Sequence, residues 1–454
     1  MHRMKTVVEW TICAAAMCLV GLTGCGVAAE VELQVVTGPA DPLFGTPVEV
    51  RVLGLDPGES VRILARSEDG AAQVFRSETT FTADENGVVD VSKQAPIAGG
   101  YEEVDPLGIF WSMKPDGGPG MWKNYMFSHL PHIQVDLEVV TTEGETVSGE
   151  IRWHFQPPAV KLVSIPVERD GLYGVLYRPA GEGPFPALIL LGGSGGGTEE
   201  WWAKTMASNG FAALALPYFN HKDLPSALLE VPVEVVGEAI AWLQGVQGVA
   251  ADRIGIAGGS KGGELALIAA ATYPEISAVV GCVPSGIVWQ GVHETEVASS
   301  WTLNGEALPF ARWFFSDDDI EKLMAGESVA LRNAYAMDKN DPGILAAATI
   351  EVERINGPVL LISGTDDQMW PSDVFGDLVM ERLETAGHPH ERRHLKVAEA
   401  GHLVFLPVFM TAANREPVQF MFGGTAKVDS HGSVEAWREM VDFLHRYLDL
   451  EASL

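Results

Sequence analysis

The stretch RIGIAGGSKGGELAL, residues 253–267, decides the fold. It begins as a β-branched run, which predicts a buried strand, and ends as an Ala/Leu run, which predicts a helix. Between them Gly258, Ser260 and Gly262 match G-x-S-x-G, the pattern of a strand-to-helix turn so sharp that the serine hydroxyl stands free of the sheet. Glycines are typical at those positions because side chains there would collide with the turn. Ser260 is therefore a candidate nucleophile, and a glycine-rich turn without chemistry is the alternative.

Strands and helices alternate on both sides of this turn. Runs that predict strands are 187–191, 212–216, 254–256, 278–283, 359–362 and 391–397, and runs that predict helices are 199–209, 231–244, 373–386 and 433–447. Residues 160–167 and 172–177 predict an antiparallel hairpin before them. Because such alternation implies a mostly parallel sheet with right-handed crossovers, the predicted class is α/β. A nucleophile after the third alternating strand is the plan of an α/β-hydrolase domain.

The residues before Pro157-Pro158 follow a different pattern. Short strand-like runs are separated by turn clusters at 31–36, 47–53, 61–67, 73–80, 88–91, 132–141 and 147–155. They predict an all-β sandwich domain over 30–157, followed by the hydrolase domain over 158–454. Aromatic residues between Tyr101 and Phe127 are expected to pack between the two domains, with a ligand-binding box as the alternative.

One span in the second domain is far longer than an ordinary connection. Pro284 to Ile355 separates two sheet strands by about seventy residues, which predicts an insertion at about 285–355 that caps the active site. The aromatic residues of this insertion, Trp289 and Trp301 among them, either line an acyl or aryl pocket or form the small core of the cap.

The N-terminus predicts export. A basic start precedes an apolar run from Trp10 to Leu22 that is too short to span a membrane as a mature helix. The run ends in Leu22-Thr23-Gly24-Cys25, which resembles a bacterial lipobox. We expect residues 1–24 to be a lipoprotein signal peptide and the Cys25 sulfur to carry the lipid that anchors the protein at the periplasmic or outer-membrane side. A plain secretory signal cut near Ala28-Ala29 is the alternative.

Charge and cysteine content exclude several classes of partner. Acidic residues outnumber basic ones by 61 to 30, a net charge of -31, and such a surface repels nucleic acid and disfavours polyphosphate ligands. With Cys13 and Cys18 in the signal and Cys25 lipidated, Cys282 has no disulfide partner. Neither a zinc-type Cys/His spacing nor a P-loop is present, so we expect no metal and no other cofactor.

A serine nucleophile needs a base, and the base needs an acid that follows the serine in this fold. Strand 359–362 runs into Gly364-Thr365-Asp366-Asp367, at the end of the strand where active-site loops lie. The frame G-x-x-D selects Asp367 as the acid, and Asp366 is then expected to cap the turn or orient a neighbour.

The expected base is His402. It lies with Gly401 in a short loop directly after the last predicted strand, where the glycine lets the ring swing over the sheet edge towards Ser260. His431 is the runner-up, and His445 is expected to be a surface or packing residue of the terminal helix.

The oxyanion hole requires two backbone donors. One is expected to be the amide of Lys261, and the other that of Gly193 or Ser194 in the glycine-rich loop 192–197. A nucleotide site is the rival for this loop, but the loop lacks the pattern G-x-G-x-x-G followed by an acidic residue at the next strand end that such sites show. The side chain of Lys261 is expected to be solvated or paired with an acid such as Glu264.

With these residues identified, the chain resembles the acyl-CoA thioesterase and bile-acid-CoA:amino-acid N-acyltransferase family. The likeness rests on Gly192 to Gly197, Ala213-Leu214-Ala215-Leu216-Pro217, Ser260-Lys261-Gly262-Gly263-Glu264-Leu265, Gly364-Thr365-Asp366-Asp367-Gln368-Met369-Trp370, Gly401-His402, Phe422-Gly423-Gly424-Thr425 and Pro47-Val48-Glu49-Val50. It covers nearly the whole mature chain, which looks like a bacterial exported member of the family.

The resemblance implies hydrolysis of acyl-CoA thioesters through a Ser/Asp/His triad and an acyl-enzyme, or acyl transfer to glycine or taurine where the nucleophile is cysteine. Ser260 favours hydrolysis, within acyl-CoA and fatty acid metabolism. Export and strong acidity favour an alternative small-molecule substrate, an ester or amide without CoA. A non-enzymatic chain whose β-domain binds a glycan or protein is the remaining alternative.

Overall fold

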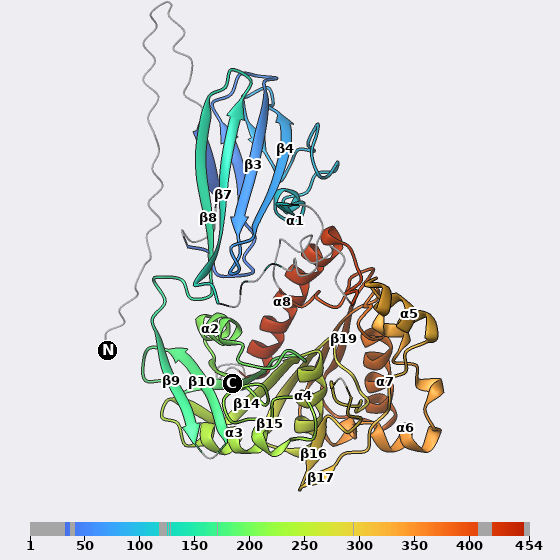
Figure 1. Cartoon of the computed structure of the whole chain (residues 1–454). Coiled ribbons are helices and arrows are strands. Elements are labelled where there is room, and N and C mark those ends of the chain that lie inside the picture. Colours follow the sequence, from blue (N-terminus) through green and yellow to red (C-terminus); the bar gives the residue numbers. More distant parts are fainter. Residues whose placement is uncertain are drawn as a thin grey trace, which may run out of the picture.

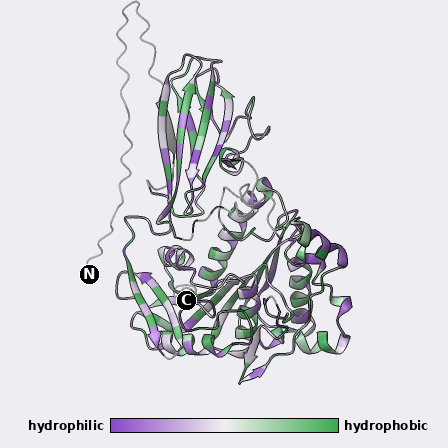
Figure 2. Cartoon of the chain, in the orientation of Figure 1, coloured by the Kyte–Doolittle hydropathy of each residue, from purple (hydrophilic) through white to green (hydrophobic). Residues whose placement is uncertain are grey.

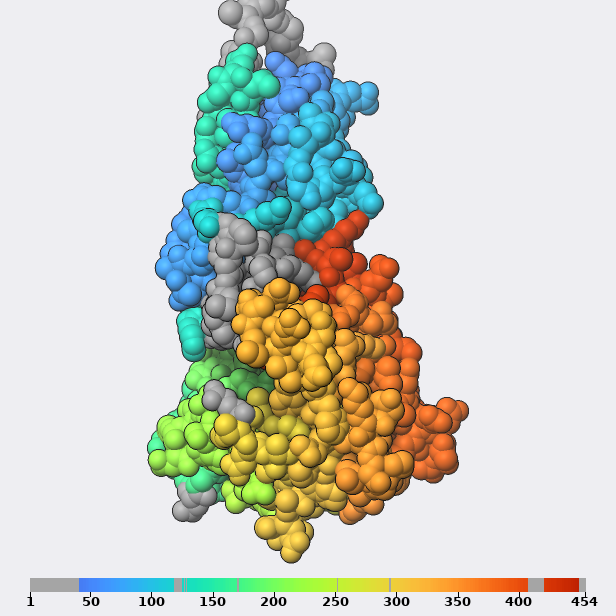
Figure 3. Space-filling model, turned by 45° about the vertical axis from the view of Figure 1, so that its right-hand side comes forward, coloured from blue at the N-terminus to red at the C-terminus, as the bar shows by residue number. Residues whose placement is uncertain are grey.

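The computed structural model describes residues 32–36, 41–117, 125, 127, 129–169, 171–293, 295–406 and 420–448, with backbone only for 32–36 and Ala251. The predicted signal, residues 1–24, and Cys25 lie outside the described residues. A β-sandwich built from the first strands stands above a larger part in which helices flank a sheet (Figure 1). In space-filling form the molecule is elongated, with the N-terminal strands at one end (Figure 3).

The N-terminal sandwich consists of two antiparallel sheets, β1-β2-β5 and β6-β4-β3-β7-β8. Its elements are β1 (Glu32–Val36), β2 (Glu49–Leu53), β3 (Ser60–Glu68), β4 (Val74–Thr82), β5 (Val89–Asp90), α1 (Gly108–Trp111), β6 (Lys114–Pro115), β7 (His132–Thr141) and β8 (Thr146–His154). Buried and exposed residues alternate along β3 and β7, so each strand turns one face to the core and one to water (Figure 2).

The second sheet has eight strands in the order β19-β18-β15-β14-β11-β12-β10-β9. They are β9 (Leu162–Arg169), β10 (Leu172–Pro179), β11 (Phe185–Leu191), β12 (Ala212–Ala215), β14 (Val249–Gly259), β15 (Ile276–Cys282), β18 (Val359–Gly364) and β19 (Arg392–Val397). Strands β11, β12, β14, β15, β18 and β19 are parallel to one another, whereas β9 and β10 form the predicted antiparallel hairpin. This sheet confirms the predicted α/β class. The strand predicted at 254–256 begins at Val249, because its first residues pair with Phe185 and Pro186.

Helices cover both faces of this sheet. One face packs against α2 (Glu200–Ser208) and α8 (Ala426–Leu448), and the other against α3 (Glu234–Gln244), α4 (Lys261–Thr272) and α7 (Ser372–Thr385). The first of these cores continues into the sandwich, where Phe44 and Phe127 lie against Trp201 with ring centroids 5.9 and 5.1 Å apart. Phe127 therefore packs between the two parts, as expected. Phe110 and Tyr125 instead pack within the sandwich, against Trp153 and Phe75. Within the described residues, no helix combines the length and apolar content needed to cross a membrane.

The insertion after β15 contains little regular structure. It holds β16 (Trp301–Leu303), β17 (Glu306–Ala307), α5 (Asp317–Ala325), α6 (Pro342–Ala348) and three 3₁₀ turns, Leu331–Asn333, Met337–Lys339 and Val352–Arg354. The helix predicted at 231–244 begins only at Glu234, because β13 (Val231–Pro232) pairs with β16. Trp289 and Trp301 are both fully buried in cores. That the insertion caps the active site stays a prediction.

Candidate active site

Ser260 occupies a strained backbone conformation between β14 and α4. Its φ of 55° and ψ of -119° lie in a region that residues other than glycine rarely adopt, and its amide donates to the Cys282 carbonyl at 2.8 Å. A Cβ at Gly258 would stand 2.1 Å from the Gly262 carbonyl oxygen, and one at Gly262 would stand 2.2 Å from the Gly192 carbonyl oxygen. The turn therefore requires both glycines, and it leaves Ser260 half-buried with its hydroxyl beyond the strand.

The predicted base and acid lie next to this serine. His402 Nε2 is 3.0 Å from Ser260 Oγ, and His402 Nδ1 is 2.8 Å from Asp367 Oδ2. Asp367 is fully buried and His402 is 5% exposed. Three side chains from the ends of β14, β18 and β19 thus form one hydrogen-bonded line at one edge of the sheet, since parallel strands end on the same side.

Asp367 receives support that the sequence pattern did not predict. The Ser372 hydroxyl donates to Oδ2 at 2.6 Å, and the amide of Met369 donates to Oδ1 at 2.9 Å. Arg332, from the insertion, donates to the Asp367 carbonyl at 2.9 Å. Hydrogen bonds to both carboxylate oxygens fix the orientation of this side chain toward His402.

Asp366 points elsewhere and orients its neighbours, as expected. Its carboxylate accepts the Gly424 amide at 2.7 Å and the Gln368 side-chain amide at 2.6 Å. The two adjacent aspartates of this turn thus have separate tasks.

The loop that carries His402 is held by α8 and by the segment that precedes α8. The Gly401 amide donates to Asp429 at 2.8 Å, and the His402 amide donates to the Phe422 carbonyl at 2.8 Å. His431, two residues after Asp429 in α8, contacts both carboxylate oxygens of Asp105 in the sandwich at 2.9 and 3.0 Å and takes no part in the line at Ser260. His445 packs against Phe211, with ring centroids 4.6 Å apart.

The expected oxyanion donors lie at the same edge. A Cβ at Gly193 would stand 3.4 Å from the Cβ of Ser260, so the glycine-rich loop approaches Ser260 closely. Ser194 follows in an exposed turn of that loop. Lys261 is the first residue of α4. The backbone N–H groups of a first helical turn have no acceptor within the helix, so they can stabilise negative charge placed next to them.

The Lys261 side chain is buried and paired with Glu264, which is the second of its two expected alternatives. Its ammonium lies 2.8 Å from Glu264 Oε1, and the two side chains are 3% and 0% exposed. Burial lowers the pKa of Lys261 and raises that of Glu264, while their mutual attraction opposes both shifts. The Trp301 indole N–H donates to the same Glu264 oxygen at 2.7 Å. The three-residue spacing of Lys261 and Glu264 on a predicted helix indicates that the two can pair, whereas the burial of the pair depends on the insertion that carries Trp301.

A second Ser-His-Asp cluster lies in the same sheet. His394 Nε2 is 3.0 Å from Ser363 Oγ, and His394 Nδ1 is 3.1 Å from Asp377 Oδ1. Ser363 is fully buried and its hydroxyl also donates to the Ser372 carbonyl at 3.0 Å. Asp377 also pairs with Lys396 at 3.0 Å. Burial lowers the pKa of the His394 imidazole, with the Asp377 charge opposing.

A mostly apolar cavity of about 240 Å³ adjoins Ser260. Its lining includes Gly193 and Gly259 beside Ser260, and otherwise mostly aromatic and aliphatic residues, Phe127, Trp201, Trp202 and Phe405 among them. Glu199 also lines the cavity, and the Trp201 indole N–H donates to its carboxylate at 2.5 Å. Burial raises the pKa of the Glu199 carboxyl.

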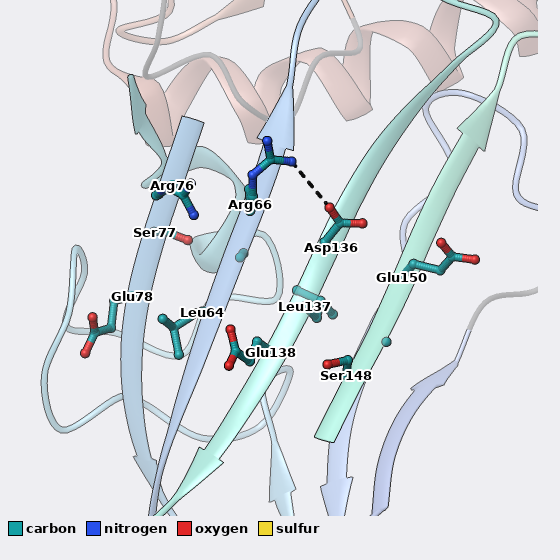
Figure 4. A pocket seen from close by; sticks show the side chains of 12 residues that line it. Leu64, Arg66, Arg76, Ser77, Glu78, Asp136, Leu137, Glu138, Ser148 and Glu150 are labelled. Carbon is teal, nitrogen blue, oxygen red and sulfur yellow. Dashed lines mark ion pairs between the residues drawn. The ribbon is translucent and has the colours of Figure 1, made fainter. Parts of the chain in front are cut away.

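A larger hollow of about 720 Å³ lies elsewhere, on the outer face of the five-stranded sandwich sheet. Its lining is charged and of mixed sign, with Arg66 and Asp136 paired at 3.5 Å (Figure 4). None of the lining residues belongs to the Ser260 site. Among the residues described, the His, Cys, Asp and Glu side chains form no group of three or more that would hold a metal ion.

Known proteins resemble this chain along most of its length. Residues 231–450 match the family model described as BAAT / Acyl-CoA thioester hydrolase C terminal, and residues 45–167 match the Acyl-CoA thioester hydrolase/BAAT N-terminal region. Acyl-coenzyme A thioesterase 1 of Rattus norvegicus is 28% identical over 422 residues, covering 88% of this chain and 93% of the relative. Peroxisomal succinyl-coenzyme A thioesterase of Mus musculus is 28% identical over 415 residues, covering 88% and 93%.

A relative named as an acyltransferase, not as a thioesterase, is about equally similar to this chain. Acyl-coenzyme A amino acid N-acyltransferase 1 of Mus musculus is 30% identical over 428 residues, covering 92% of this chain and 98% of the relative. These matches confirm the predicted family: the chain belongs to the acyl-CoA thioester hydrolases and bile acid-CoA:amino acid N-acyltransferases.

Proposed function

We propose that this protein hydrolyses acyl thioesters, with Ser260 as nucleophile, His402 as general base and Asp367 as its acid partner. The observation that carries the proposal is the unbroken line of hydrogen bonds, 3.0 Å from Ser260 to His402 and 2.8 Å from His402 to Asp367, at a strained strand-to-helix turn. Family membership supports the acyl-thioester class of substrate.

In the proposed reaction, Ser260 Oγ attacks the acyl carbonyl while His402 Nε2 takes the hydroxyl proton. Asp367 stabilises the imidazolium and fixes its tautomer through Nδ1. The backbone amides of Lys261 and Gly193 bind the oxyanion of the tetrahedral intermediate. His402 then gives the proton to the departing thiolate, which leaves as a thiol. Water, deprotonated by His402, attacks the acyl-enzyme, and Ser260 recovers its proton as the carboxylic acid departs.

The apolar cavity beside Gly193 and Gly259 is the proposed site of the acyl group. An acyl chain buried there contacts Trp201, Trp202 and Phe405 and gains free energy in proportion to the apolar area removed from water. A volume of about 240 Å³ favours acyl groups of modest size over long chains that would have to extend beyond it.

A second candidate function keeps the same residues but changes the leaving group. The net charge of -31 opposes a ligand with several phosphates, which favours an ester or amide substrate without CoA. The 30% identical N-acyltransferase relative makes glycine and taurine further acceptors to test.

The test is a substrate panel on the purified protein, comprising acyl-CoAs of graded chain length, p-nitrophenyl esters and aminoacyl amides, each with and without glycine or taurine. We expect release of free acid from thioesters and labelling of Ser260 by a fluorophosphonate probe. Turnover restricted to esters or amides would select the second candidate. Absence of labelling together with absence of turnover would exclude a serine hydrolase.

We further propose that the chain is an exported lipoprotein anchored through Cys25. The support is the basic start, the apolar run and the lipobox-like Leu22-Thr23-Gly24-Cys25. Expression of the full chain in a bacterial host should place it in the membrane fraction, and Cys25→Ser should release it. Equal membrane association of both forms would contradict the lipid anchor.

A further inference from the structure

Tyr218 holds the loop that faces the nucleophile. It lies just beyond the end of β12, is 2% exposed, and its hydroxyl lies 2.6 Å from the Gly192 carbonyl oxygen and 3.1 Å from that of Gly193. Burial raises the pKa of this phenol, and the charges of Glu264 and Glu199 raise it further. The hydroxyl therefore stays protonated and acts as a donor to these two carbonyls.

A peptide unit is planar, with its carbonyl and its N–H pointing in opposite directions. The Gly192 carbonyl shares a peptide unit with the Gly193 N–H, and the Gly193 carbonyl shares one with the Ser194 N–H. A donor that fixes both carbonyl oxygens on one side therefore fixes both N–H groups on the other side. Gly193 and Ser194 are the two alternative residues expected to supply the oxyanion donor opposite the Lys261 amide, and they lie in a loop whose glycines leave its peptide planes free to rotate.

We propose that Tyr218 is a positioning residue for the oxyanion hole. Its hydroxyl sets the orientation of the peptide units that precede Gly193 and Ser194 and so aims their N–H groups at the site where negative charge develops beside Ser260. This inference rests on the proposed function, because it assigns a task within that reaction. It adds a residue that does not touch the substrate and acts through the backbone.

Tyr218 is itself fixed by the insertion. Its ring lies against Trp301 with centroids 5.6 Å apart, and the Trp301 indole donates to Glu264 at 2.7 Å. Glu264 holds the Lys261 ammonium at 2.8 Å, and the Lys261 amide is the other proposed oxyanion donor. A single indole thus contacts the supports of both halves of the hole. Direct backbone contact reinforces this, since Gly262 lies against the Gly192 carbonyl.

The test is Tyr218→Phe, which keeps the ring against Trp301 and removes only the hydroxyl. We expect kcat to fall about 10- to 100-fold, less than the loss of a whole oxyanion donor, with KM within about two-fold. Affinity for a trifluoromethyl ketone analogue of the substrate, which forms an oxyanion on Ser260, should fall by a similar factor. Affinity for the free acid product should not change.

Tyr447→Phe is the matched control, because it removes a hydroxyl that donates to Glu391 near the end of α8. It should leave kcat and the affinity for the ketone unchanged. Trp301→Phe, which removes the indole N–H, is the second variant and should weaken ketone affinity by a smaller factor than Tyr218→Phe.

Three outcomes decide between the possibilities. Unchanged kcat and ketone affinity in Tyr218→Phe, in a wild-type enzyme that is active, would overturn the positioning role. A loss of kcat that comes with an equal loss of product affinity and of melting temperature would also overturn it, in favour of a purely structural role. A wild-type protein with no turnover and no fluorophosphonate labelling would instead overturn the proposed function itself.

Discussion

The second domain contains two Ser-His-Asp clusters whose hydrogen-bond distances are nearly the same. Ser260, His402 and Asp367 are joined at 3.0 and 2.8 Å, and Ser363, His394 and Asp377 at 3.0 and 3.1 Å. The first serine lies half-buried at a strained turn beside a cavity, whereas the second is fully buried. The burial of the acids shows the opposite contrast. Asp367, in the first cluster, is fully buried, whereas Asp377, in the second, is exposed and paired with Lys396.

The comparison teaches that the set of residue types does not make a nucleophile. Ser363 has one proton, and both the Ser372 carbonyl and His394 compete for it. No substrate carbonyl reaches a side chain without exposed surface. At Ser260, the proposed nucleophile, the backbone conformation, the neighbouring N–H groups and the adjoining cavity distinguish the site from that of Ser363.

The serines offer the largest test of this contrast. Ser260→Ala should lower kcat by about 10⁴- to 10⁶-fold on the best substrate of the panel, since the base then has nothing to activate. Ser363→Ala should leave kcat within about two-fold, because that hydroxyl meets no substrate. Steady-state kinetics checks both, and fluorophosphonate labelling should survive only in Ser363→Ala. Comparable losses in the two variants would contradict the distinction.

The acids come next. Asp367→Asn should lower kcat by about 10³- to 10⁴-fold, because the amide favours the wrong tautomer of His402 and leaves the imidazolium unstabilised. Asp377→Asn should change kcat by less than about two-fold, since an exposed ion pair contributes little. Both substitutions conserve shape, so circular dichroism should report folded proteins. An equal effect of the two would show that burial of the acid does not matter.

Ser372 lies between the clusters, and its substitution should sharpen the comparison. Its hydroxyl donates to Asp367 at 2.6 Å, while its carbonyl accepts from Ser363 at 3.0 Å. Ser372→Ala should lower kcat about 10-fold and the free energy of unfolding by about 1.5–3 kcal/mol, because a hydrogen bond to a charged group is lost. Ser363→Ala should lower the unfolding free energy by about 1 kcal/mol with kcat unchanged.

Urea denaturation and initial rates on the same preparations separate the two effects. A normal kcat in Ser372→Ala would mean that the two amides on the other oxygen of Asp367 suffice to orient it.

The smallest effect is a pH dependence of stability from the second cluster. Burial holds the pKa of folded His394 below its ordinary value of 6.5. As pH falls below about 6.5, the unfolded chain binds a proton that the folded imidazole does not, so this contribution to stability is complete above that pH and is lost below it. The slope from one group is at most about 1.4 kcal/mol per pH unit.

His394→Gln should therefore give a shallower fall in unfolding free energy between pH 7.5 and 5 than the wild type. His388 and His154, whose pKa values burial also lowers, keep part of the slope in both proteins. Urea midpoints across that range provide the measurement, and parallel slopes would contradict the assignment to His394.

Local patterns were enough to predict the residues that stand directly after strands. Ser260, Asp367 and His402 each follow a strand in a short turn, so spacing and chain order identified them, and the parallel sheet brings their side chains together. The sheet strands and most helices followed from periodicity. The short strands β13, β16 and β17 did not, since two or three residues show no period.

Residues that act from other elements were not predicted. Ser372 precedes a predicted helix, where a serine ordinarily caps the N-terminus, and its hydroxyl instead donates to Asp367. Tyr218 directly follows the Ala213-to-Pro217 stretch of the family resemblance, but its contact with Gly192 and Gly193 depends on how two loops meet. The burial of Lys261 depends on where the insertion places Trp301, and no local pattern determines that position.

The first turns of α8 connect the base to the other end of the molecule. Asp429 accepts a hydrogen bond from the Gly401 amide beside His402, and His431 on the same helix contacts the Asp105 carboxylate of the sandwich. A truncation that kept only the hydrolase domain would remove the far anchor of this helix and loosen the loop that carries the imidazole. In the proposed reaction the β-sandwich thus supports the loop that carries the proton-transferring His402, and an engineered minimal enzyme would need another support for that loop.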